Sequence, residues 1–431
     1  MPFETPLDAP RRIAVIGGGI SGMSAAHMLS RGNSVVLFEA EGRMGGHART
    51  VLAGKRGDQP VDTGFIVFNR VNYPHMVKLF ESLDVPVAPS SMTFAASIDG
   101  GRIEYGLRTL NAVFAQRRNL VRPAYLRMLR DIMTFNARAE AVADDPDMTI
   151  RDFLRRLGTG PWFRDYYILP LSGAIWSTPT QGILDFPAQA MIRFFRNHAL
   201  LSATGQHQWY TVRGGSIQYV TRLCTAMTRA GVHIRLSAPV AGVQRVPGGV
   251  LVRAHGGEWE LFDDVVFGTH SDDTLALLAD ASPEERAALG AVKYQPNEAV
   301  LHCDASVMPK RRMTWASWNY TEAAGKQADR IDLTYWMNSL QPIPQDDPLF
   351  VTLNATQPIR QDLIYDTATF RHPVYDLAAL AAQGQVRAMN GTRNTWFCGA
   401  WLKNGFHEDG ISSAVDVVTA MAAREERVAA A

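Results

Sequence analysis

The feature that most constrains the fold lies near the N-terminus. Residues 12–16 form a short apolar run rich in β-branched residues, which is typical of a buried parallel strand. The run leads directly into a G-G-G-I-S-G turn at residues 17–22. A helix is expected over residues 23–30 and a second strand over 34–38, which ends at Glu39. This order of strand, glycine turn, helix, strand and acid predicts a dinucleotide-binding module.

Each part of this Rossmann-like module has a physical role. Gly17 permits the tight turn, Gly19 lets the backbone approach a pyrophosphate, and Gly22 allows the helix to pack closely on the strand. The phosphates then lie at the helix N-terminus, where free N–H groups and the helix dipole favour negative charge. Glu39 would accept hydrogen bonds from the adenosine ribose, and an acid here disfavours NADP. The predicted cofactor contacts in this module are Gly17, Gly19, Ile20, Ser21, Gly22, Glu39 and Ala40.

A second glycine pair, Gly45 and Gly46, follows the ribose-binding acid. A nicotinamide cofactor would already be seated by the first module, whereas FAD is longer and continues past it. The glycine pair would let the backbone pass under the ribityl and isoalloxazine parts of FAD, and V-D-T-G-F at 61–65 continues the same path. The alternative is a solvated turn. The further predicted contacts with FAD are Arg43, which can face a phosphate, Gly45, Gly46, His47, Gly64, Phe65 and Ile66.

A second anion-binding motif is predicted near the C-terminus. Residues 395–400 read as a short apolar strand that enters a turn of small residues, and a helix is expected over 412–422. The acid-glycine step before this helix, Asp409-Gly410, would place a helix N-terminus against the cofactor. Asp409 would bind the ribityl hydroxyls, and the helix start would face flavin N1 and O2, where negative charge develops on reduction. The predicted contacts here are Gly399, Asp409, Gly410 and Ile411.

Together these motifs resemble the flavin amine oxidase and phytoene desaturase superfamily, and most closely a bacterial branch of amine-oxidase-like proteins described as predicted NAD/FAD-binding. The likeness covers roughly residues 11 to 422. It rests on G-G-H at 45–47, V-D-T-G-F-I-V-F-N at 61–69, F-A-Q-R-R-N-L at 114–120, A-I-W-S-T-P at 174–179, T-V-R-G-G-S at 211–216, Y-Q-P-N-E-A-V-L-H at 294–302 and G-F-H-E-D-G at 405–410.

The resemblance implies an α/β fold (α+β overall) of two interleaved domains. A Rossmann-like FAD-binding domain would be assembled from residues 1–70, 205–285 and 390–431, and a substrate-binding domain of the amine oxidase type from 71–204 and 286–389. Apolar runs at 232–236, 240–245, 250–254 and 265–267 fit the strands of the middle FAD segment. In that pattern Val240 would meet the adenine through its backbone. Because no cysteine lies between Cys303 and Cys398, noncovalent FAD is expected.

Two positions depart from the pattern of the amine oxidases. Most of them carry a lysine near flavin N5, in the strand that corresponds to about 294–303, whereas this chain has only Lys293 just outside it. His407 stands where many amine oxidases place an aromatic residue that faces the flavin. Both departures argue against simple amine oxidation.

The overall composition excludes several classes of protein. At 431 residues the chain exceeds the usual size of one hydrophobic core, and its formal net charge of +1 gives no overall attraction to nucleic acid. The three cysteines are far apart and lack histidines at metal-ligand spacing, so neither a disulfide framework nor a metal site is predicted. The first residues do not form a signal peptide, and no apolar run reaches the roughly 20 residues that span a bilayer. A cytoplasmic location is therefore expected.

The segment 108–130 is strongly basic, with six arginines and no acid. Tyr125, Met128, Leu129 and Ile132 recur at helical spacing beside these arginines. This pattern predicts a helix on an anionic membrane surface, at the inner face of the membrane. The alternative is a core helix with a solvated basic face.

The resemblance implies an activity as well as a fold. Relatives in this branch are linked to modification of methylated or unsaturated acyl chains, so an FAD-dependent desaturation of a phospholipid acyl chain is expected. Hydride would leave a carbon beside a double bond for flavin N5, and His407 is the candidate base, with packing against the flavin as its alternative role. Two other functions stay open: an amine oxidase acting on a small amine or polyamine, and a noncatalytic flavin-binding partner protein.

Overall fold

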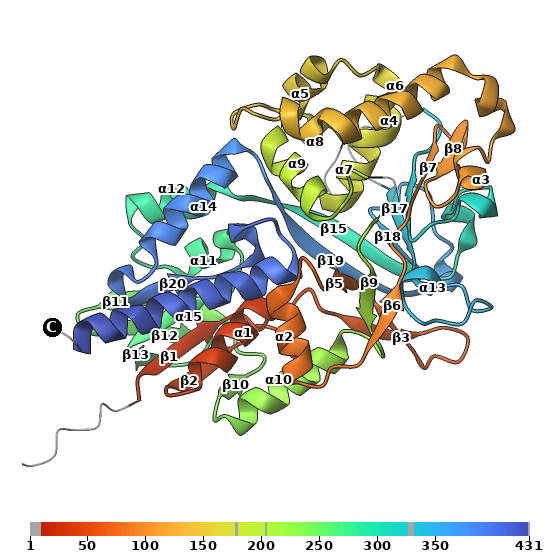
Figure 1. Cartoon of the computed structure of the whole chain (residues 1–431). Helices are drawn as coiled ribbons and strands as arrows, with labels where there is room; N and C mark the ends of the chain where they lie inside the picture. The colour runs from red at the N-terminus through yellow and green to blue at the C-terminus, as the bar shows by residue number, and fades with distance from the viewer. Residues whose placement is uncertain (1–9, 177–179, 203–204, 326–331, 430–431) are drawn as a thin grey trace, which may run out of the picture.

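The computed structural model describes residues 10–176, 180–202, 205–325 and 332–429, and it has the expected mixed α/β class (Figure 1). Ser177–Pro179 of the A-I-W-S-T-P motif lie outside the described residues. One part of the molecule is built around a parallel sheet whose strands come from both the N-terminal and the C-terminal parts of the chain. The other part places a helical cap on a larger mixed sheet. The extents of the two predicted domains stay a prediction.

The parallel sheet has five strands from widely separated parts of the sequence. In spatial order they are β10 (His233–Arg235), β2 (Ser34–Phe38), β1 (Arg12–Ile16), β14 (Asp264–Phe267) and β20 (Thr395–Phe397). The central strands are buried on both faces, which explains their continuous apolar character. Helices α1 (Ile20–Leu29), α10 (Ile217–Arg229) and α15 (His407–Ala429) share a core with this sheet.

A small antiparallel sheet adjoins the parallel one. It contains β11 (Val240–Val246), β12 (Gly249–Ala254) and β13 (Trp259–Phe262). The sequence predicted the first two strands, but β13 was missed because its outward residues break the apolar run.

The mixed sheet has seven strands in the order β19-β15-β18-β17-β16-β7-β8. Their bounds are β19 (Ile364–Val374), β15 (Lys293–His302), β18 (Phe350–Leu353), β17 (Asp332–Trp336), β16 (Trp318–Thr321), β7 (Phe94–Ile98) and β8 (Ile103–Gly106). The long strands β15 and β19 pair along their length and extend from the mixed sheet toward the parallel sheet (Figure 1). The cap includes α4 (Pro123–Val142), α5 (Ile150–Leu157), α7 (Leu169–Trp176) and α9 (Ala188–Asn197), whose apolar residues share one core with this sheet.

Helix α4 corrects one interpretation of the basic segment. Tyr125 and Met128 are fully buried, and Leu129 and Ile132 pack against the core of the cap. The apolar stripe therefore faces inward, because it fills the space above the mixed sheet, and α4 is a core helix with a basic outer face. None of the helices in the described part of the chain is both long enough and apolar enough to cross a bilayer.

Both helices that flank the glycine motifs begin earlier than expected. Helix α1 starts at Ile20, directly after the glycine turn, and α15 starts at His407 rather than at residue 412. The early start of α15 has a local cause. Glu408 and Asp409 lie in its first turn, where the helix dipole favours acids, and Asp409 Oδ2 accepts a hydrogen bond from the backbone N–H of Phe406 at 2.9 Å.

A buried aspartate connects the glycine motifs to both parts of the molecule. Asp62, at the end of β4 (Gln59–Asp62), is fully buried. Its carboxylate accepts hydrogen bonds from Thr50 Oγ1 at 2.6 Å, from Ser216 N and Oγ at 2.8 Å, and from Gln341 Nε2 at 2.9 Å. Desolvation raises the pKa of Asp62 to about 6. This network explains the T-V-R-G-G-S motif, because Ser216 and the preceding Gly215 must approach Thr50 and Asp62 closely.

Removing the Asp62 carboxylate is expected to destabilise the protein strongly. Asp62→Ala leaves several buried donors without an acceptor, and the free energy of unfolding should fall by about 3 kcal/mol. Urea unfolding followed by circular dichroism measures the change. Asp58→Ala, which removes an exposed carboxylate just before the same strand, is the control and should have little effect. Equal midpoints for the two variants would show that the network contributes no stability.

Candidate flavin site

The first glycine turn has the geometry that a phosphate requires. Gly17 has φ of +103°, and a Cβ at Gly22 would lie 1.9 Å from the carbonyl oxygen of Gly17. A Cβ at Gly19 would meet nothing within 4 Å, so the backbone there is open to a ligand. Helix α1 begins at this point with no side-chain cap and no acid in its first turn. Its first N–H groups are therefore available to an anion.

Glu39 lies where the sequence predicted it, at the end of β2 beside the glycine turn. Its Oε2 accepts a hydrogen bond from Gly18 N at 2.5 Å, and its Oε1 accepts one from Glu41 N at 2.7 Å. The backbone N–H of Ala238 donates to Glu39 O at 2.9 Å. This hydrogen bond places the start of β11, at Val240, next to the end of β2. The predicted ribose-binding and adenine-binding positions are thus neighbours, and Ala40 is exposed beside them.

The two glycine turns lie directly against each other. Gly45 N donates to Gly18 O at 2.8 Å, and a Cβ at Gly46 would lie 3.1 Å from Gly19 Cα. The Arg43 guanidinium donates to Gly46 O at 3.0 Å and to Ala48 O at 3.2 Å. Arg43 therefore braces the second turn from within the protein, and its contact with a phosphate stays a prediction.

The C-terminal motif meets the first glycine turn from the opposite side. A Cβ at Gly410 would lie 2.8 Å from both Ser21 Oγ and Ile20 Cγ2, so the N-termini of α15 and α1 touch. Gly399 N donates to Ser413 Oγ at 2.8 Å, which ties the turn after β20 to α15, and Ile411 is buried in the shared core. Burial raises the pKa of Asp409 to about 6.

The V-D-T-G-F segment follows the second glycine turn closely. Phe65 N donates to His47 O at 2.9 Å, and a Cβ at Gly64 would lie 1.9 Å from the same oxygen, so only glycine fits. The ring of Phe65 stacks on the ring of His407, with centroids 3.9 Å apart and planes 15° apart. Ile66 is buried next to Phe65.

His407 is held by a residue that the sequence did not single out. Its Nε2 lies 2.9 Å from the hydroxyl of Tyr219, a fully buried side chain of α10. Burial of the ring, together with the nearby His47, lowers the pKa of His407 to about 3. The imidazole is therefore neutral throughout the physiological range.

The structure also gathers a polar cluster, of three half-buried histidines and the buried Asn297, that sequence reasoning missed. The His47 ring centroid lies 5.7 Å from that of His270 and 5.5 Å from that of His372. Asn297 of β15 lies beside them, with Nδ2 2.7 Å from His372 Nδ1. Burial lowers the pKa of both His270 and His372 to about 3. The cluster comes from four segments far apart in sequence, so spacing carries no signal for it.

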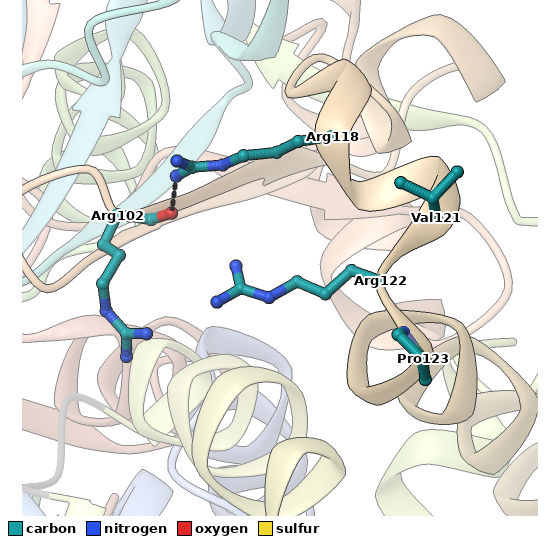
Figure 2. Close-up of a pocket in the computed structure, with 5 residues that line it drawn as sticks. All are labelled: Arg102, Arg118, Val121, Arg122 and Pro123. Carbon is teal, nitrogen blue, oxygen red and sulfur yellow. Dashed lines mark hydrogen bonds between the residues drawn. The ribbon is translucent and has the colours of Figure 1, made fainter.

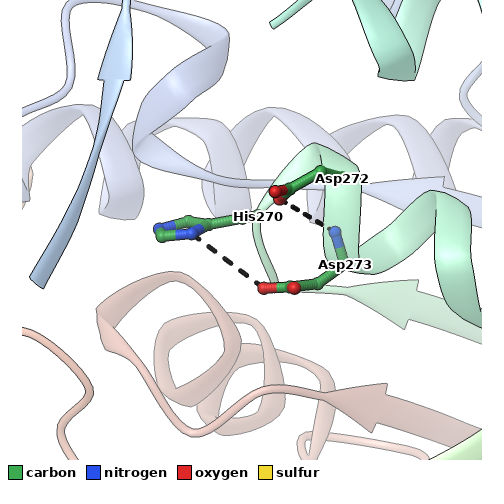
Figure 3. Close-up of side chains that lie close together, drawn as sticks. All are labelled: His270, Asp272 and Asp273. Carbon is green, nitrogen blue, oxygen red and sulfur yellow. Dashed lines mark hydrogen bonds and ion pairs between the residues drawn. The ribbon is translucent and has the colours of Figure 1, made fainter. Parts of the chain in front are cut away.

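Three potential metal ligands lie close together beside this cluster: His270, Asp272 and Asp273 (Figure 3). His270 Nδ1 is 4.0 Å from Asp273 Oδ2. Arg371 of β19 forms ion pairs with both aspartates, at 2.8 Å in the case of Asp272. The positive charge that these carboxylates need is thus already present, and the group forms an ion-pair network.

These features fit FAD. The two glycine turns contact each other, and because they carry no side chains a long dinucleotide can lie against their backbone. The N-termini of α1 and α15 both lie at the first glycine turn, and Glu39 lies at the position expected to bind the ribose. The fold and the site therefore define a flavin-binding oxidoreductase.

Comparisons with known proteins agree with this class. The family described as flavin containing amine oxidoreductase matches residues 20–326. Among solved structures, a CLA-producing fatty acid isomerase from P. acnes has a TM-score of 0.69 at 14% identity, covering 96% of this chain and 99% of the other. Cyclohexylamine oxidase from Brevibacterium oxydans IH-35A also has a TM-score of 0.69 at 14% identity, covering 97% and 100% of the two chains.

Curated relatives match over shorter stretches. The FAD-dependent oxidoreductase oblC of Cochliobolus heterostrophus is 33% identical over 100 residues, which are 23% of this chain and 19% of that protein. The chain aligns with less than a fifth of the length of each of the curated relatives it matches. Because the family match covers more than half of the chain, the chain belongs to the flavin containing amine oxidoreductases, and it is an FAD-dependent oxidoreductase.

Loss of the Glu39 carboxylate is expected to weaken FAD binding. Glu39→Ala removes the acceptor for the ribose hydroxyls, and a hydrogen bond to a charged group contributes about 1.5–3 kcal/mol, so Kd should rise at least about tenfold. Quenching of flavin fluorescence on titration of the apoprotein measures Kd. Glu41→Ala, an exposed carboxylate two residues away, is the control and should leave Kd unchanged. Equal affinity of the Glu39 variant and the parent protein would remove Glu39 from the cofactor site.

Proposed function

We propose that the protein desaturates an unsaturated or methylated fatty acyl chain of a phospholipid. The observation that carries the proposal is an aromatic cluster that begins beside His407. The ring of Phe406 stacks on Phe194 of α9, with centroids 4.9 Å apart, and Trp176 at the end of α7 lies 4.9 Å from Phe194. Phe194 and Trp176 are buried in the core of the cap, so the environment beside His407 is apolar, as the binding of a hydrocarbon chain requires.

The cluster ends at a buried hydroxyl. Phe186 lies 4.9 Å from Trp176 and 6.3 Å from Tyr375, measured between ring centroids. Within the described residues the Tyr375 hydroxyl has no hydrogen-bond partner, although it is buried. An unpaired buried hydroxyl is costly, so a polar group of a bound molecule would stabilise it.

The strand β15 supports a substrate other than an amine. Lys293 is exposed, and its Nζ donates to Gly290 O at 2.8 Å. Asn297, the first buried residue of this strand, has its side chain engaged with His372. The lysine that most amine oxidases use near flavin N5 therefore has no counterpart in β15, whose only lysine is Lys293. The solved neighbours include both a fatty acid isomerase and amine oxidases, so amine oxidation is the second candidate.

The residues of this chain can bind the substrate and accept one proton. Bound FAD would supply a two-electron acceptor that takes a hydride at N5. Loss of hydride from a carbon next to a double bond leaves a delocalised allylic cation on the substrate. The neighbouring C–H of such a cation is strongly acidic, so even a weak base can remove its proton. The reoxidant of the reduced enzyme would be oxygen or a quinone.

His407 suits the role of that weak base. With its pKa lowered to about 3, its imidazole is unprotonated at neutral pH and can accept a proton from a strong carbon acid. Tyr219, 2.9 Å from Nε2, would hold the ring in place.

The decisive experiment is flavin reduction without oxygen. Phospholipids that bear methylated monounsaturated chains should bleach the visible absorbance of the purified protein, and mass spectrometry should find a product with an added double bond. The same phospholipid with saturated, unmethylated chains is the control and should leave the flavin oxidised. Bleaching by putrescine or cyclohexylamine, but not by the lipid, would establish the amine oxidase instead. A flavin that neither lipid nor amine reduces would fit a noncatalytic partner.

The role of His407 has a separate test. His407→Gln should lower the rate at which the desaturated product forms at least about a hundredfold, while FAD content and the reduction of the flavin by lipid stay normal, because the base acts after hydride transfer. For the parent enzyme, this rate should not fall between about pH 7 and pH 5, because a group with its pKa lowered to about 3 stays unprotonated over that range. Exposed His233→Gln is the control. Full turnover of the His407 variant would leave only the packing role.

A further inference from the structure

An apolar surface is exposed on the cap, around the N-terminal end of α4. It spans α3 (Leu110–Val113), the short helix η1 (Arg117–Val121) and the outer face of α4, and we name it the 107–133 surface. Leu110 is 79% exposed, Val121 81% and Met133 59%. Large apolar side chains this exposed and this close in sequence mark an interaction site. The set consists of Leu107, Leu110, Leu120, Val121, Leu126 and Met133.

These side chains are distinct from the buried stripe of α4. Leu126, Arg130 and Met133 follow one another at helical spacing on the outer face, whereas Tyr125 and Met128 face the core. Arg117 of η1 forms hydrogen bonds with Asn111 and with Phe114 O, which holds α3 beside η1. The apolar groups of α3, η1 and α4 are thus neighbours.

The charge of the surface has one sign. The six arginines between 108 and 130 have no acid among them in the sequence. In the part of the chain that the structure describes, only Arg127 of these six forms an ion pair, at 3.8 Å with Asp131. The positive charge of the other five guanidinium groups is therefore not neutralised by an acid within the described residues.

Three arginines converge on a pocket at the edge of this surface (Figure 2). The pocket has a volume of about 430 Å³ and is lined by Arg102, Arg118, Val121, Arg122 and Pro123. Arg118 Nη2 donates to Arg102 O at 2.6 Å, and the Arg122 guanidinium lies 4.9 Å from the Trp162 ring centroid. Arg102 is fixed by Asp99 and by the hydroxyl of Tyr166. The positive groups are therefore held in place before a ligand binds.

We propose that the 107–133 surface docks on an anionic phospholipid bilayer, with a headgroup phosphate in the pocket of Arg102, Arg118 and Arg122. Planar guanidinium groups suit phosphate oxygens, and the protruding aliphatic side chains would enter the acyl boundary. Aliphatic groups flanked by unpaired arginines fit a lipid surface better than another protein, whose interface would need acids opposite them. This inference does not depend on the identity of the substrate.

Vesicle flotation tests the proposal. The flavin-loaded protein should float with vesicles of saturated phosphatidylcholine and phosphatidylglycerol and should not float with phosphatidylcholine alone. Saturated chains exclude turnover, so failure of docking and failure of the proposed reaction are separate results. High salt should weaken the binding, because surface charges are screened.

Two variants separate the contributions of charge and apolar contact. Arg118→Gln with Arg122→Gln should weaken binding to the anionic vesicles about tenfold or more, and Leu120→Ser with Val121→Ser should weaken it as well. Arg222→Gln with Arg229→Gln removes the same charge from exposed positions of α10 and should bind like the parent protein.

Three results would overturn the proposal: equal binding to neutral vesicles, equal loss of binding in the α10 control, and a dimer in solution that the Leu120→Ser/Val121→Ser variant abolishes. The last result would assign the surface to a second copy of the chain. Circular dichroism and FAD content confirm that each variant is folded.

Discussion

The N-termini of two helices from opposite ends of the chain meet at one point, and the rest of the structure depends on this contact. Gly410 of α15 approaches Ser21 of α1 so closely that any side chain at residue 410 would collide. Each helix N-terminus carries a partial positive charge, which Glu408 and Asp409 offset at α15 but no acid offsets in the first turn of α1. A pyrophosphate and an electron-rich flavin ring are the kinds of group that make this arrangement stable.

Around this contact, the glycines determine how close the backbone segments come, and Asp62 determines how the two parts of the molecule are joined. Gly45 and Gly46 let the second turn lie on the first, and Gly64 lets the next strand lie on the second turn. Asp62 then binds Ser216 before α10 and Gln341 from the mixed sheet side. One buried carboxylate thereby joins the segment before α10 to the segment that follows α13 (Met337–Leu340).

The glycine motifs could be predicted from sequence because their contacts are made by backbone, whose requirements appear directly as residue type. The starts of α1 and α15 were misplaced, because the glycine-rich residues at the start of α1 and the acid-rich first turn of α15 resemble loops until their hydrogen bonds are known. The sequence could not decide whether the apolar stripe of α4 faces the protein core or a membrane, because Tyr125 and Met128 suit either environment. The cluster of His47, His270 and His372 could not be predicted, because its residues come from three distant segments that only the tertiary fold brings together.

The position of β20 and α15 has a consequence for biosynthesis. Strand β20 completes the parallel sheet at the edge formed by β14, and α15 supplies half of the helix contact at the cofactor site. A chain emerging from the ribosome N-terminus first can form the glycine turns early, but it lacks a closed flavin site until α15 has been made. Cofactor loading should therefore follow the synthesis of α15, and an intermediate that lacks this helix should bind FAD far more weakly.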